Sequence, residues 1–379
     1  MKLKSRGTIY DATNRAADEQ VASFVSLCRL SSGSILCGFQ LGPAKHAVTS
    51  TIRLCRSDDH GRSWQELPYR FETQIDGVSG SLSSGELVEL EPNHLLLYAT
   101  WFDRSDPGRP LFDPETQGIL HSRQLLSESH DDGATWSDWR EVPTPGLSGC
   151  SSTGPIQQWP DGRIALAFES YKEFDDLSPA THGAWLMVSH DKGRSFDAPF
   201  LVAQHPEHRI FYWDQRVCQG NDTDESIALF WTHDLKEERD LTVHLRRFSV
   251  SDRQTTPVIM DTGIPGQIAA PLMLPDGRLQ AFVVDRSGPM TMKLWQSPDG
   301  GHTWPPNDAL LVYEHNEQAV LSQGNSDIDY ADYWDDMLQW SFGHPAIRLL
   351  DSGEVLLAYY AGVPNCLSVH FAVIDAHES

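Results

Sequence analysis

The sequence predicts an all-β fold, a six-bladed β-propeller formed as a single domain by residues 1–379. Two repeated patterns support this prediction. A strand–turn–strand pattern occurs six times, and a turn motif of the form Ser-x-Asp-x-Gly-x-Ser/Thr-Trp/Phe occurs four times. The length of the repeat agrees, because one sixth of the 379 residues is about enough for one four-stranded sheet. A radial arrangement of such sheets would hide their edges.

Each strand–turn–strand repeat is centred on a short polar turn. The six turns are Ser32-Gly33, Pro92-Asn93, Asp161-Gly162, Asp224-Glu225, Asp276-Gly277 and Ser352-Gly353. The apolar runs that follow them predict strands at 35–39, 95–100, 164–169, 227–232, 279–284 and 355–360. Each of these runs would be the second strand of one blade.

The four copies of the turn motif begin at Ser57, Ser129, Ser189 and Ser297. Each copy follows an alternating apolar run, so we expect it at a turn that closes a strand pair. The glycine can adopt a positive φ, the Asp carboxylate can accept N–H groups of the loop, and the final aromatic ring can anchor the turn. We therefore assign Asp59, Asp131, Asp191 and Asp299 a structural role.

Two blades lack this motif. The gap between the third and fourth copies is about twice the others, so the blade around 246–255 has lost its copy, and the last blade has none. The early segment Gly7-Thr-Ile-Tyr10 alternates in polarity and has no partner nearby in the sequence. We expect it to be the outer strand that closes the ring with the C-terminal strands.

The composition limits the partners. With 53 acidic and 29 basic residues, the formal charge of -24 disfavours binding to nucleic acid or an anionic membrane. No apolar run is long enough to cross a bilayer. The N-terminal residues show no signal peptide, which predicts a cytoplasmic protein, or a secreted or periplasmic one had a signal been removed. The six cysteines have no Cys-x-x-Cys spacing and are expected as buried thiols. No spacing suggests a metal or cofactor site.

The four turn motifs and the six repeats resemble the sialidase superfamily of six-bladed, Asp-box propellers over essentially the whole chain. The resemblance implies a carbohydrate ligand. Sialidases also carry an early Arg-Ile-Pro strand, an arginine triad and a nucleophilic Tyr. The first inner strand here reads Phe24-Val-Ser-Leu-Cys-Arg-Leu30, and the last blade reads Trp340-Ser-Phe-Gly-His-Pro345. The chain therefore departs from standard sialidases and is also similar to exo-acting arabinan hydrolases of the same shape.

In such a fold the pocket lies on the central axis, where innermost strands begin and second strands end. Carboxylates at these positions are the candidate catalytic groups, since hydrolysis of a glycoside needs two of them. Glu169 ends an apolar strand, and Asp214 follows the aromatic run 211–213. Asp285 and Asp103 are the next candidates. Each of the four could instead cap a loop or pair with a cation.

Candidate substrate-binding residues stand beside these carboxylates. Arg104, Arg216 and Arg286 could converge on a sugar carboxylate, or each could pair with the adjacent Asp. His233 and His344 could transfer protons near neutral pH. Trp213 and Tyr360 could contact the sugar.

Three functions remain open. The first is an exo-acting glycoside hydrolase, which would include action on an anionic sugar. The second is a polysaccharide lyase, in which Arg neutralises a uronate and His233, His344 or Tyr360 removes the proton. The third is a propeller that binds a glycan without catalysis.

Overall fold

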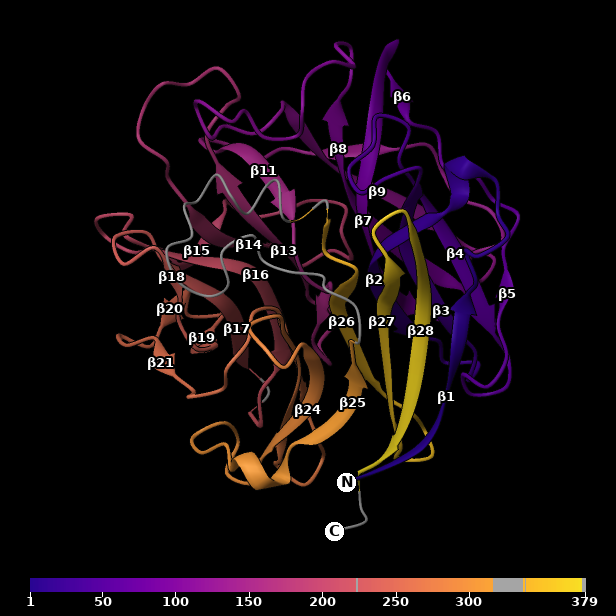
Figure 1. Cartoon of the computed structure of the whole chain (residues 1–379), viewed down its shortest axis with the longest axis vertical. Coiled ribbons are helices and arrows are strands. Elements are labelled where there is room, and N and C mark those ends of the chain that lie inside the picture. Colours follow the sequence, from indigo (N-terminus) through magenta and orange to yellow (C-terminus); the bar gives the residue numbers. More distant parts are fainter. Residues whose placement is uncertain (223, 316–336, 338, 377–379) are drawn as a thin grey trace.

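The computed structural model describes residues 1–222, 224–315, 337 and 339–376 (Figure 1). Its strands form antiparallel units of four main strands that follow one another around the molecule in chain order. We number these units 1 to 6. No described helix is both long enough and apolar enough to cross a membrane.

The first three units are built from the N-terminal half of the chain. Unit 1 contains β2 (Val21–Arg29), β3 (Ile35–Gly42), β4 (Thr51–Ser57) and β5 (Gln65–Glu66). Unit 2 contains β7 (Val78–Glu91), β8 (His94–Asp103), β9 (Ser122–Ser129) and β10 (Arg140–Val142), and β6 (Gln74–Ile75) pairs with β7. Unit 3 contains β11 (Ser148–Ser152), β13 (Ile164–Tyr171), β14 (Gly183–Ser189) and β15 (Phe200–Ala203), and β12 (Gln157–Gln158) pairs with β13.

The other three units complete the order. Unit 4 contains β16 (Ile210–Gln219), β17 (Glu225–Asp234), β19 (His244–Ser249) and β20 (Gln254–Thr255), with β18 (Arg239–Asp240) and β21 (Met260–Asp261) at its edges. Unit 5 contains β22 (Ala269–Met273), β23 (Leu279–Asp285), β24 (Thr291–Ser297) and β25 (Leu310–Glu314). Unit 6 contains β26 (Phe342–Leu349), β27 (Val355–Val363), β28 (Cys366–Asp375) and β1 (Lys2–Tyr10). Two 3₁₀ turns, η1 (Ala17–Glu19) and η2 (Pro306–Asp308), lie in connections.

All six predicted second strands are present, as β3, β8, β13, β17, β23 and β27. The N-terminal segment also pairs as expected. Strand β1 runs antiparallel to β28, from Leu3 opposite Ile374 to Tyr10 opposite Val369, and places the two ends of the chain in one sheet (Figure 1). Unit 6 is joined to unit 1 by one parallel pair, Val21 with Leu367.

The core lies between the units. Six hydrophobic clusters are present among the described residues. Five of them are built mainly from two consecutive units, and the remaining one extends over units 2 to 6. One cluster, for example, joins Leu36 and Leu54 of unit 1 to Leu95 and Trp101 of unit 2. Among the first strands, β2 contacts β7 and β26, and β22 contacts β16 and β26. All six cysteines are unpaired, and only Cys366 is not fully buried.

The four turn motifs lie between the third and fourth strands of units 1, 2, 3 and 5. In the first copy, Asp59 accepts the N–H of Ser63 at 2.8 Å and its hydroxyl at 2.6 Å, and the Trp64 indole donates to Gly61. The hydrogen bond from the Ser63 hydroxyl is the largest of the effects that lower the pKa of Asp59 to about 2. A carboxylate held this way stabilises a turn, which supports the structural role predicted for the motif. Unit 4 lacks the motif, and Asp224 there binds the hydroxyls of Ser249 and Ser251.

Deletion of residues 1–12 should lower the melting temperature by at least about 5 °C, because it exposes the edge of β28 and removes the buried side chains of Ile9 and Tyr10. Thermal unfolding followed by circular dichroism, with the full chain measured in parallel, checks this. An unchanged melting temperature would show that β1 contributes nothing to the fold.

Candidate active site

Four inner strands share one irregularity. In β2, β7, β16 and β26, two residues lie opposite a single residue of the neighbouring strand, which is a β-bulge. The first residue of each bulge has a left-handed backbone: Phe24 (φ 53°), Ser84 (63°), Asp214 (48°) and His344 (51°). All four residues line the same cavity. The bulges therefore direct side chains from four units to one place.

This cavity encloses about 880 Å³ of space, its open mouth included. Its walls are mostly apolar, with Phe102, Phe112, Trp213, Trp231 and Trp340 among them. Among the described residues, the ionisable groups that line it are His46, Glu169, Tyr171, Asp214, Arg286, His344 and Tyr360. Apolar walls with a few convergent polar groups are typical of a site for a small molecule.

Glu169 is buried, with 1% of its surface exposed. Its Oε2 accepts the hydroxyl of Tyr171 at 2.5 Å, and its Oε1 accepts the N–H of Gln215 at 3.2 Å. The Nε2 atom of His182 lies 3.2 Å from Oε2. Both oxygens of the Glu169 side chain are therefore held in place by neighbouring donors.

Asp214 lies near Glu169, and its surroundings change its pKa. Burial raises its pKa to about 7, and the negative charge of Glu169 adds to this, while Arg216 and Arg286 act against it. The residue keeps some exposed surface in the cavity that it lines. One wall thus holds both Glu169 and Asp214, and Asp214 keeps its proton up to about neutral pH.

Arg286 lines the same cavity and is fixed by its neighbours. Its guanidinium carbon lies 4.1 Å from the centre of the Trp340 ring, and its Nη2 donates to the carbonyl oxygen of Phe342 at 2.9 Å. It is also hydrogen-bonded to the hydroxyl of Tyr360. A Cβ atom at Gly343 would lie 2.2 Å from Nη2, so a larger residue there would displace the guanidinium. Burial raises the pKa of Tyr360, which keeps its phenol protonated.

A hydrogen-bond chain continues from this guanidinium to His233. The Nη1 atom of Arg286 donates to Gln267, whose amide donates to Asp240 at 3.1 Å. Asp240 also accepts the indole N–H of Trp231 at 2.8 Å and lies 3.1 Å from the Nδ1 of His233. His233 therefore lies behind the wall and is not a lining residue, contrary to the sequence-based expectation.

His344 lines the cavity, but both of its ring nitrogens are occupied. Its Nε2 lies 2.6 Å from the Nη2 of Arg216, and because a guanidinium only donates, this nitrogen is the acceptor. The Nδ1 atom then donates to the carbonyl oxygen of Val25 at 3.2 Å. Burial, followed by the charge of Arg216, holds the pKa of His344 well below its usual value. The ring is therefore neutral and has no free nitrogen for proton transfer. Arg216 is buried behind it and does not line the cavity.

Arg104 is also behind the wall. It donates to Ser81 at 2.9 Å and to the carbonyl oxygen of His46 at 2.8 Å. The expected convergence of Arg104, Arg216 and Arg286 is thus not present. The alternative expectation, that each arginine pairs with the Asp next to it in the sequence, is also wrong. Within the described part of the chain, none of the three arginines forms an ion pair with its adjacent Asp.

Asp103 and Asp285 do not line the cavity either. Each stands at the end of a second strand and accepts the N–H of the residue two positions on, Ser105 at 2.8 Å and Ser287 at 2.9 Å. The side chain therefore closes its own turn, which is a common role of Asp at this position.

Several lining and neighbouring residues had no part in the sequence-based site. Tyr171 could have been found, because it stands two residues after Glu169 and side chains two apart share one face of a strand. His182 and Lys45 are buried polar residues that only the structure brings near the site. The Lys45 ammonium binds the carbonyl oxygens of Met337 and Trp340, and Met337 and Trp340 line the cavity. Burial lowers the pKa of His46 to about 3.

Comparison with known proteins supports the fold. No protein-family model matches the chain, and no curated protein matches its sequence. Among solved structures, a protein of unknown function from Dyadobacter fermentans has a TM-score of 0.74 at 18% identity and covers 99% of this chain and 98% of its own. A Hadza microbial sialidase has a TM-score of 0.69 at 15% identity, over 98% of this chain and 68% of its own. The α-L-arabinanase of Penicillium chrysogenum, in complex with arabinobiose, has 0.66 at 15%, over 99% of both chains.

These likenesses establish the class of fold, a propeller of the kind found in sialidases and arabinanases. The low identities leave the reaction to be argued from the site. The organisation of residues 1–379 as a single domain stays a prediction.

Replacement of Asp214 by Asn should change how stability depends on pH. The pKa of Asp214 is about 7 in the folded protein and about 3.9 in an unfolded chain, so the folded state holds this proton more tightly. Ionisation then costs stability as the pH rises from about 4 through 7, by at most about 4 kcal/mol. Asparagine tolerates the left-handed backbone and cannot ionise.

We therefore expect the wild type to lose more stability than Asp214→Asn between pH 5 and pH 8, measured by urea unfolding. Asp103→Asn, outside the cavity, is the control and should follow the wild type. Parallel curves for the wild type and Asp214→Asn would contradict the assignment.

Proposed function

We propose that the chain is a six-bladed propeller, closed by β1, that hydrolyses the terminal glycosidic bond of a glycan. The observation that carries this proposal is the pair formed by Glu169 and Asp214 on one cavity wall. Glu169 accepts hydrogen bonds at both of its oxygens, whereas burial raises the pKa of Asp214, and glycoside hydrolysis needs two carboxyl groups in different roles.

Asp214 is the proton donor in this proposal, because a pKa of about 7 keeps it protonated at neutral pH. It would protonate the glycosidic oxygen as the bond to the leaving group breaks. Glu169, whose oxygens accept hydrogen bonds from Tyr171 and Gln215, would act as the carboxylate that either attacks the sugar or activates a water molecule.

The cavity walls suit a sugar. The rings of Phe24, Trp213 and Trp340 line it and would pack against the C–H groups of the sugar. Because residues from all six units contribute to the lining, the cavity is enclosed around its axis and fits the end of a chain rather than its middle. Arg286 is the single guanidinium among the described lining residues, so the site offers one positive side chain, not three, to an anionic sugar.

Two other functions have less support. In a lyase, the base that removes the proton would be His233, His344 or Tyr360. His233 does not line the cavity, both nitrogens of His344 are occupied, and the pKa of Tyr360 is raised. A propeller that only binds glycans would have no need for a carboxyl group with the raised pKa of Asp214.

Glu169→Gln should lower turnover by about 10²- to 10⁴-fold, because the amide keeps the shape of the side chain but removes the negative charge. The assay is release of a terminal sugar from a panel of arabinosides, rhamnosides, sialosides and uronate-containing oligosaccharides. Asp285→Asn, a carboxylate outside the cavity, is the matched control and should retain turnover. Equal rates for the wild type and Glu169→Gln would refute this role.

The products distinguish the three functions. Mass spectrometry after incubation with the same panel should show a product that has gained one water. An unsaturated sugar would establish the lyase instead, and saturable binding without any product would establish a glycan-binding protein.

A further inference from the structure

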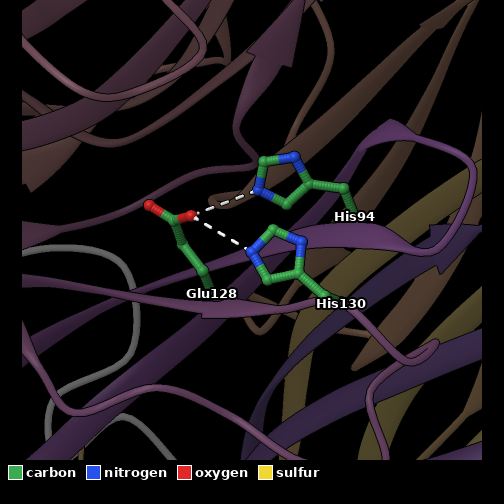
Figure 2. A group of neighbouring side chains, drawn as sticks. All are labelled: His94, Glu128 and His130. Atoms are coloured by element: carbon green, nitrogen blue, oxygen red, sulfur yellow. Dashed lines mark hydrogen bonds and ion pairs between the residues drawn. The ribbon is translucent and has the colours of Figure 1, made fainter.

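Three ionisable side chains, His94, Glu128 and His130, gather on unit 2 (Figure 2). His94 begins β8, whereas Phe102, which lines the cavity, is near the other end of that strand. The group is therefore separated from the cavity by roughly 25 Å of extended strand. It has no part in the proposed hydrolysis.

The strand register explains why the three side chains meet. Leu95 pairs with Ser129 and Leu96 pairs with Glu128, so His94 lies opposite His130, one step beyond the last pair. Opposite residues of an antiparallel pair share a face, as do residues two apart on one strand. All three side chains therefore lie on one face of the β8–β9 pair.

The two histidines are aimed at one oxygen atom. The Nε2 of His94 lies 3.2 Å from the Oε2 of Glu128, and the Nε2 of His130 lies 3.8 Å from the same atom. Figure 2 shows both rings directed toward this carboxylate, and the rings stack with their centres 4.3 Å apart. Arg140 approaches the other oxygen, Oε1, at 4.0 Å, which leaves Oε2 for the histidines.

The other units with the turn motif carry different chemistry at these three positions. Each of them has an arginine in the set. The corresponding residues are Ser34, Arg56 and Asp58 in unit 1, Arg163, Val188 and His190 in unit 3, and Arg278, Gln296 and Pro298 in unit 5. In unit 1 the arginine binds both of its partners. Unit 2 alone among these four replaces that cation by two imidazoles and a carboxylate.

We propose that His94, Glu128 and His130 bind one Zn²⁺ ion, with water as the fourth ligand. Two imidazoles and one carboxylate are a donor set that zinc favours. Tetrahedral zinc with bonds of about 2.0–2.1 Å needs ligand atoms about 3.3 Å apart. The three atoms here already lie within 4.8 Å of one another. The side chain of His130 is 69% exposed and free to rotate by the small amount required.

The ion would act as a clamp. His94 is the first residue of β8 and His130 follows the last residue of β9, so zinc would join the adjacent ends of two strands of unit 2. The Arg140 contact would orient the carboxylate from outside the metal site. The expected consequence is higher thermal stability of the protein with zinc, without a change in turnover.

The test is calorimetric titration of ZnCl₂ into tag-free protein stripped of metal with a chelator, together with melting curves with and without zinc. We expect one site and a rise in melting temperature of a few degrees. Each of the variants His94→Ala and His130→Ala should weaken zinc binding at least about tenfold. Replacing a residue that only supports a metal ligand already has an effect of this size. Because His130 is exposed, its variant should fold normally.

His190→Ala is the matched control. His190 occupies the same position in unit 3 and has a carboxylate partner, Asp197, at 3.2 Å, but it has Arg163 where unit 2 has His94. This variant should bind zinc as the wild type does. The proposal is overturned if the wild type takes up no zinc, or if His130→Ala binds it equally well.

Discussion

The site depends on a backbone constraint, the bulge at the same depth in four inner strands. A non-glycine residue in the left-handed region costs on the order of 1 kcal/mol or more, so each bulge must be held by its surroundings. Phe24 shows how this is done, since its ring lies 4.8 Å from that of His46 and 5.1 Å from that of His344. The bulge residues Phe24 and His344 thus support each other between the consecutive units 1 and 6.

The charges near the axis follow from the same arrangement. Glu169 and Asp214 share a wall, and their repulsion adds to the effect of burial on Asp214. Arg286 lies in the same wall and Arg216 lies behind His344, and the positive charges of both act against the rise in the pKa of Asp214. Arg216 also keeps His344 neutral. Arg216, which the sequence suggested as a substrate ligand, thus supports the cavity wall, because its Nη1 and Nη2 are already bound to Pro345 and His344.

The structure places Glu169 in the cavity lining, as expected from its position at the end of a regular strand, while its catalytic role stays a prediction. Glu169 is the sixth residue of β13, a strand without a bulge, and alternation places its side chain on the expected face. Asp103 and Asp285 also end regular strands, but their carboxylates close the following turns. The sequence did not show which of these acidic side chains would reach the cavity and which would close a turn. The zinc ligands could not be recognised from spacing, since His94 and Glu128 come from different strands. Their proximity depends on the register of β8 with β9.

The sequence by itself determined the all-β class, the six second strands, the four hydrogen-bonded turns and the pairing of the N-terminal strand, because period-2 alternation and turn chemistry are local properties. The tertiary structure decided which polar side chains share the cavity. A bulge adds one residue to a strand and turns the next side chain to another face, so the direction of residues such as Asp214 and His344 cannot be counted from the strand ends. Long-range packing also decided that Arg104 and Arg216 lie behind the wall while Arg286 lines it, since their partners, such as His46 and His344, come from other units.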